Sequence, residues 1–140
     1  MYIKPFGTHC IVQVTPVHYE LTFEPIFSNF TFEGKETINV KMTKPTSTII
    51  LNAAELKIKK CIVESAGKSY VGQTTLDEKN ETLMIKIPSK INKTAKIHIE
   101  FSGILNDRLV GFYRSQYKDK SGKTKYLATT QFEAADARRA

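Results

Sequence analysis

Few side chains in this 140-residue chain have the types and spacing that catalysis requires. A zinc peptidase needs two histidines one helical turn apart with a general-base glutamate between them, in the pattern H-E-x-x-H. The three histidines, His9, His18 and His98, never take that spacing. His18 and His98 also occupy alternating positions that are expected to face water. We therefore expect no metal site among these histidines.

The two cysteines, Cys10 and Cys61, do not indicate nucleophilic catalysis, because neither lies in the elbow-type turn that exposes a nucleophile to a neighbouring base. None of the seven glycines has the spacing of a phosphate-binding loop. The chain has 14 acidic residues, but nothing singles out a pair of them for glycoside chemistry. The sequence thus predicts no catalytic residue between positions 1 and 140.

The stretch from Lys125 to Ala140 changes character halfway. Its first residues favour a strand, and from Phe132 onward glutamate, alanine and arginine favour a helix. Taken alone, Glu133 is interpreted as a first-turn carboxylate that complements the positive end of the helix dipole. No glycine, asparagine or proline closes this helical pattern, so we expect the polypeptide to continue beyond Ala140.

Most of the chain alternates apolar and polar residues with the period of a strand, so the elements that position any site are strands. Short strands at close spacing without a long helix predict an all-β fold, either an antiparallel β-sandwich or an open pair of sheets. A short helical start is expected at the C-terminal end. The positions predicted to face the core include Val17, Tyr19, Leu21, Phe23, Phe32, Ile38, Val40, Leu83, Ile85, Ile87, Ile97, Ile99 and Phe101.

Four places are expected to interrupt the strands. Gly34 and the charged Glu36 on an apolar face predict a bulge. The residues from Asn52 to Glu55 are interpreted as a single turn capped by Asn52. The alternation slips at Lys59-Lys60, and Pro88 is expected to end its strand.

Composition limits the partners. The length suits one domain over residues 1–140, and a domain of this size buries roughly 70% of its unfolded surface. The net charge of +7 is spread over lysines interleaved with apolar residues, so neither nucleic acid nor a membrane is expected as a partner. Two cysteines without a secretory signal favour a reduced, cytoplasmic setting, although a disulfide between Cys10 and Cys61 stays open.

A family resemblance is carried by four stretches in register. These are Pro16 to Leu21, Leu51 to Leu56, Phe101 to Asp107 with Gly111 to Ser115, and Thr129 to Ala140. They resemble the N-terminal domain of the zinc aminopeptidases of the gluzincin family, which includes aminopeptidase N, puromycin-sensitive aminopeptidase and the archaeal tricorn-interacting factors. The resemblance implies a saddle-shaped pair of sheets. It also implies a catalytic zinc domain beyond residue 140, without which residues 131–140 are expected to be mobile or held by a neighbouring molecule.

The resemblance also assigns roles to two residues. The matching glutamate, Glu133, would reach into the active site and bind the free α-amino group of a peptide substrate. The matching glutamine, Gln131, would line the pocket for the first side chain. Zinc would be bound by the parent enzyme and not by this chain, which would be inactive alone.

Two other readings stay open. A non-catalytic scaffold relative would keep the same architecture and lose the zinc site. A free-standing β-sandwich module would bind sugars or proteins without any following domain. An H-E-x-x-H motif downstream, with a further glutamate, would select the aminopeptidase.

Overall fold

A computed structural model describes residues 13–140, which fold almost entirely into antiparallel strands. The strands are β1 (Val14–Ile26), β2 (Thr31–Met42), β3 (Thr46–Asn52), β4 (Leu56–Ser65), β5 (Lys68–Val71), β6 (Gln73–Asp77), β7 (Thr82–Ile91), β8 (Thr94–Ile104), β9 (Gly111–Lys118) and β10 (Thr124–Gln131). Two short helical turns follow, α1 (Glu133–Asp136) and η1 (Ala137–Arg139). The predicted all-β class and the helical start after Phe132 are confirmed.

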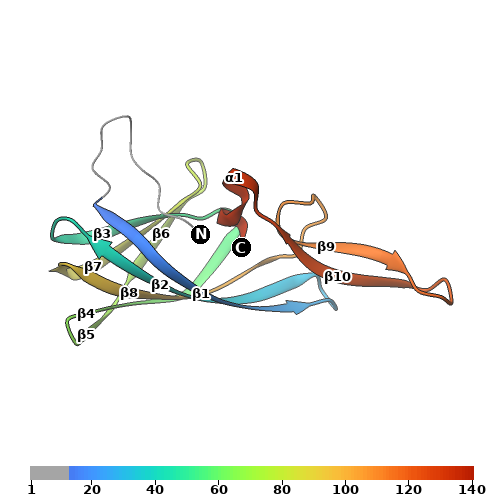
Figure 1. Ribbon diagram of the computed structural model, residues 1–140, viewed down its shortest axis with the longest axis horizontal. Coiled ribbons are helices and arrows are strands. Elements are labelled where there is room, and N and C mark those ends of the chain that lie inside the picture. Colours follow the sequence, from blue (N-terminus) through green and yellow to red (C-terminus); the bar gives the residue numbers. More distant parts are fainter. Residues whose placement is uncertain (1–12) are drawn as a thin grey trace.

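The described strands form three sheets. Five strands pair in the order β1-β2-β8-β4-β5, three in the order β3-β7-β6, and β9 pairs with β10 as a hairpin. Figure 1 shows the two larger sheets gathered toward one end of an elongated molecule and the β9–β10 hairpin extending at the other. The helical turn α1 lies over the middle, between these two parts.

The hydrophobic core is built by the strands with the cleanest alternation. Leu83 and Ile85 of β7 and Ile97 and Ile99 of β8 are each at most 1% exposed. Burying one such side chain stabilises a fold by about 1.5 to 3 kcal/mol. Since successive side chains of a strand point to opposite faces, the polar residues between them face water. The predicted core positions of these two strands are thus confirmed.

An aromatic cluster joins the five-stranded sheet to the hairpin. Phe23 of β1 and Phe32 of β2 lie against Phe112 of β9, with ring centroids 4.9 and 5.1 Å away. The ring of Phe101 covers Gly34, where a Cβ atom would stand 2.5 Å from it. Glycine at position 34 therefore makes room for a core ring.

The bulge predicted at Gly34 and Glu36 is wrong. The pairing of β2 with β8 runs through both residues without a shift, and Glu36 stays on the apolar face, only 2% exposed. The irregularity lies instead in β1, between Pro16 and His18. Val17 sits at this shift and is 56% exposed, contrary to its predicted core position.

Leu21 was also expected in the core, but it is 42% exposed. It lies on β1, which is the edge strand of the five-stranded sheet, so its packing depends on one neighbouring strand only. Tyr19 and Phe23 on the same strand are half-buried and pack against the core.

Two further expectations about interruptions are corrected. Pro88 lies inside β7, where the pairing with β3 is irregular, and an irregular ladder tolerates the missing amide hydrogen of proline. Between β3 and β4, residues 53 and 54 form no regular element and Glu55 is a bend, so the predicted turn from Asn52 to Glu55 is absent. The slip at Lys59-Lys60 is confirmed, because the register of β4 with β8 shifts between Ile58 and Lys60. His9 and Cys10 lie outside the described residues.

Candidate functional site

The two residues assigned to substrate binding lie on either side of a half-buried aromatic ring. Gln131 is the last residue of β10 and pairs with Gly111 of β9. Glu133 is the first residue of α1, and both side chains are exposed. Phe132 between them packs against the core. Strand alternation and this anchoring ring therefore turn both polar side chains toward solvent.

The carboxylate of Glu133 has no hydrogen bond or ion pair with the residues that the structure describes. A helix of four residues has only a small dipole, so the first-turn interpretation of Glu133 explains little of its presence here. Phe132, at the N-cap, makes no side-chain capping bond. The arrangement presents a negative charge at the surface, on a short segment next to a core residue.

The segment after Glu133 is held by a cluster of ion pairs. Arg139 reaches three carboxylates at once: its Nη1 lies 2.9 Å from Glu55, its Nη2 lies 2.9 Å from Glu81, and its Nε lies 3.5 Å from Asp136. Arg138 Nη1 binds the other oxygen of Glu81 at 2.6 Å. Arg108 completes the cluster with a second bond to Glu55. The arginine hydrogen bonds, the one from Arg138 first, hold the pKa of Glu81 below its usual value.

Backbone contacts fix the same segment. The amide of Ala54 donates to the backbone carbonyl of Arg138 at 2.8 Å, and the amide of Ala53 donates to the backbone carbonyl of Glu81 at 2.9 Å. Ala140 is 2% exposed and belongs to the core cluster. Residues 138–140 therefore pack on this domain itself. The mobility expected for residues 131–140 stays a prediction.

Arg139 brings together three of the four stretches that carry the family resemblance, through its ion pair with Glu55 and its close contact with Gly111. Glu55 comes from the β3–β4 link, Gly111 from the start of β9, and Arg138 and Arg139 from the C-terminal end. The sequence does not predict that these stretches are in contact, and nothing in it distinguishes Glu81 from the other acidic residues. Opposite charges are the only sequence signal, and they do not specify which residues pair.

A further arginine, Arg114, stabilises the position of the β9–β10 hairpin. The guanidinium of Arg114 lies 4.4 Å from the ring centroid of Phe30 and 2.9 Å from the carboxylate of Asp107. Tyr126 of β10 packs edge-on against Phe30 with centroids 4.9 Å apart. Cation–π and aromatic contacts of this kind contribute about 0.5 to 1.5 kcal/mol each. They tie the β9–β10 hairpin, which ends in Gln131, to the β1–β2 turn.

The other candidate residues stay apart. His98 contacts Thr37 at 3.0 Å and Glu64 at 3.4 Å on the outer face of the sheet, and His18 is exposed. Burial raises the pKa of the Cys61 thiol to about 11, which keeps it protonated and a poor nucleophile. Between residues 13 and 140 no three His, Cys, Asp or Glu side chains are grouped so that they could hold a metal ion.

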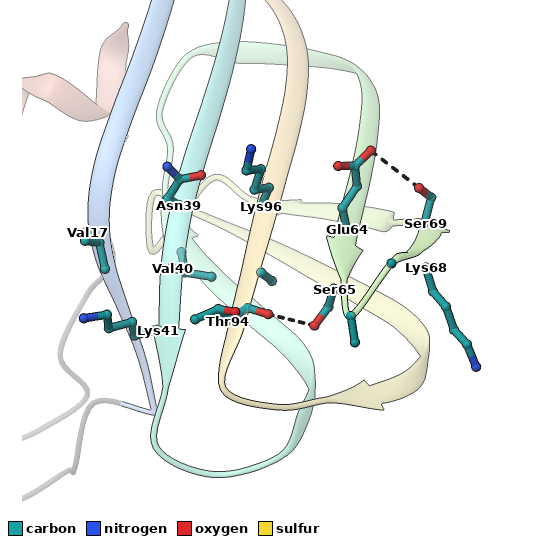
Figure 2. A pocket seen from close by; sticks show the side chains of 13 residues that line it. Val17, Asn39, Val40, Lys41, Glu64, Ser65, Lys68, Ser69, Thr94 and Lys96 are labelled. Atoms are coloured by element: carbon teal, nitrogen blue, oxygen red, sulfur yellow. Dashed lines mark hydrogen bonds between the residues drawn. The ribbon is translucent and has the colours of Figure 1, made fainter.

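A groove of about 530 Å³ lies at one end of the five-stranded sheet, away from α1. Figure 2 shows Lys96 and Glu64 side by side on adjacent strands, with Lys41 and Lys68 at the edges of the groove. Ser65 donates to the Thr94 carbonyl at 2.7 Å. Among the described residues that line the groove there is no histidine or cysteine.

Comparisons with known proteins agree with the resemblance. Residues 15–140 match the family described as the peptidase M1 N-terminal domain. The chain is 44% identical to aminopeptidase 2 of Candida albicans and 40% identical to the alanine/arginine aminopeptidase of Saccharomyces cerevisiae, each over 91% of its own length. It is 38% identical to the puromycin-sensitive aminopeptidase of Caenorhabditis elegans over 88% of its length. These alignments span only 13 to 15% of the three relatives.

Proposed function

The chain belongs to the peptidase M1 N-terminal domain family, and we propose that it is the N-terminal domain of a zinc-dependent aminopeptidase that removes N-terminal residues from peptides. In this proposal residues 1–140 are one domain, and the catalytic domain follows in the same polypeptide. The names of the relatives and the small share of each that the chain covers support this assignment.

One observation carries the role of this domain: the exposed carboxylate of Glu133, which has no partner among the described residues, lies on a segment that is anchored on both sides. Phe132 anchors it toward the core, and Arg138 and Arg139 anchor it through Glu55 and Glu81. We assign Glu133 the binding of the substrate's α-ammonium and Gln131 a wall of the pocket for the first side chain.

The physical chemistry fits an exopeptidase. A charge-assisted hydrogen bond between a carboxylate and a primary ammonium is short and roughly twice as strong as a neutral one. Once the following domain covers the site, the carboxylate loses its water. A blocked or internal peptide would leave that charge unpaired, so the site would reject it.

The described residues do not fit a zinc site, because they contain no cluster of metal ligands. In this proposal zinc is bound by the rest of the enzyme, where it would polarise the scissile carbonyl and activate water. This domain contributes the amine anchor and part of the pocket, and alone it is inactive.

Peptide N-termini and the catalytic domain are the proposed partners, without nucleic acid or membrane. No helix in the described part of the chain is long and apolar enough to cross a membrane. Cys61 is a buried free thiol, which supports a reducing, cytoplasmic compartment.

The full-length protein tests this function. It should release the N-terminal residue from an unblocked peptide and leave the N-acetylated peptide intact, whereas residues 1–140 alone should cleave neither. Equal cleavage of the blocked and unblocked peptides would contradict an aminopeptidase.

A further inference from the structure

We propose that Arg139 is a positioning residue, which fixes the segment carrying Glu133 by binding Glu55 and Glu81 and so sets where the Glu133 carboxylate meets the substrate ammonium. This inference rests on the proposed function, because it concerns the same amine anchor. In the proposed function the ion-pair cluster around Arg139 contacts neither substrate nor metal, and the inference gives this cluster a role.

The geometry of Arg139 supports this role. Its guanidinium uses all three nitrogens, on carboxylates from the β3–β4 link, the β6–β7 turn and α1. The side chain is only 20% exposed. A planar fork with fixed donor directions locks both the place and the rotation of the segment, which a lysine ammonium cannot do.

The two glutamates that form ion pairs with Arg139 both have unfavourable backbone conformations. Glu55 has φ of 60° and Glu81 has φ of 51°, the left-handed region that costs a residue with a side chain free energy relative to glycine. Strained residues of this kind are found where the surrounding structure demands one side chain in one direction. Here each strained residue points its carboxylate at an arginine of the C-terminal segment.

A role in overall stability alone explains this arrangement poorly. Partly buried ion pairs often contribute little to stability compared with well-packed apolar groups, because both charges lose water. Their better attested use is to select one conformation. The conformation selected here is that of residues 133–139, whose first member carries the proposed anchor.

The test uses the full-length protein and compares wild type with Arg139→Lys, which keeps the charge and loses the fork. The readout is the ratio of inhibition constants of a dipeptide amide and its des-amino counterpart, since that ratio isolates the amine contact. A misplacement of about 1 Å costs an enzyme site on the order of a hundredfold. We expect the ratio to fall by about tenfold to a hundredfold in Arg139→Lys, and amide exchange of residues 131–136 to speed up.

Two variants keep the test decisive. Glu55→Gln removes one of the three carboxylates and should lower the ratio of inhibition constants in the same direction but by less. It provides the test if Arg139→Lys folds poorly. Lys59→Gln removes an exposed ion pair with Glu33 on the sheet and should change neither readout. Exchange at Ile85 and Ile97 should stay slow in every variant.

The outcomes separate the two proposals. If the wild-type enzyme binds the dipeptide amide no more tightly than its des-amino counterpart, the proposed function and the inference are both overturned. A wild type that prefers the amine, with the same preference and the same exchange in Arg139→Lys and Glu55→Gln, leaves the function standing and overturns the positioning role.

Discussion

Gly111 and Arg139 touch so closely that a Cβ atom on Gly111 would stand 2.6 Å from the Cβ of Arg139 and 3.1 Å from its carbonyl oxygen. Gly111 also has φ of +68°, a conformation that side chains disfavour. The start of β9 and the C-terminal turn therefore pack backbone against backbone, with no room for a side chain between them.

Gly111→Ala should consequently destabilise the domain by roughly 2 to 5 kcal/mol, the sum of a left-handed alanine and a steric clash. Urea unfolding measures this loss. Gly67→Ala is the matched control, because Gly67 has φ of +73° but nothing within 4 Å of its added Cβ. Equal losses in both variants would show that the contact with Arg139 contributes nothing.

Glu36 should make the domain less stable as the pH rises. Burial raises the pKa of this carboxyl from 4.5 to about 7, and the pKa of the neighbouring Tyr19 is raised to about 12 by its own burial and then by Glu36. A carboxyl whose folded pKa is raised favours folding below its unfolded pKa. That advantage is lost as the pH climbs from about 4.5 through about 7.

Glu36→Gln should therefore be more stable than wild type at pH 8, by on the order of 3 kcal/mol. Its stability should also change less with pH between pH 4.5 and 7. Melting temperatures across that range give the measurement. Glu100→Gln, an exposed position on β8, serves as control and should follow the wild-type slope. A wild-type melting temperature that rises through this range, unchanged by Glu36→Gln, would contradict the burial of an ionisable Glu36.

Cys61 should react slowly with thiol reagents in the folded protein, because it is 3% exposed and burial raises its pKa to about 11. Unfolding without reductant should release two titratable thiols from residues 1–140, since Cys61 is free. A count of zero in a monomer would show a disulfide with Cys10 and argue against the reducing compartment.

The sequence predicted those parts of the fold that depend on local alternation. Ile85 and Ile97 are buried as expected, because period two alone decides which face of a strand is apolar. Val17 was misplaced because its exposure follows from a register shift between two strands, which no local pattern records. Glu36 shows the same limit, because the sheet keeps its register there and buries a carboxyl group, where the local pattern predicted a bulge.

The site was predictable only in part. Composition alone gave a helix start at Glu133, and its role in binding an amine came from the family resemblance. The ion pairs of Arg139 join residues 84 and 58 positions apart in the sequence, so periodicity could not reveal them. A chain with 21 basic and 14 acidic residues allows many such pairings, and only the fold selects among them.

The most direct test of the account is a paired measurement of kcat/KM and melting temperature on the full-length protein and its Glu133→Gln variant. The substitution keeps the shape and removes the charge. We expect kcat/KM for unblocked peptides to fall by about 30-fold to several thousand-fold, the cost of about 2 to 5 kcal/mol for one partner of a buried charge pair. The melting temperature should not change, and Glu20→Gln, an exposed glutamate on β1, should change neither quantity. Unchanged kinetics beside a stability loss of roughly 0.3 to 1 kcal/mol would identify Glu133 as a helix-terminus residue and contradict the amine anchor.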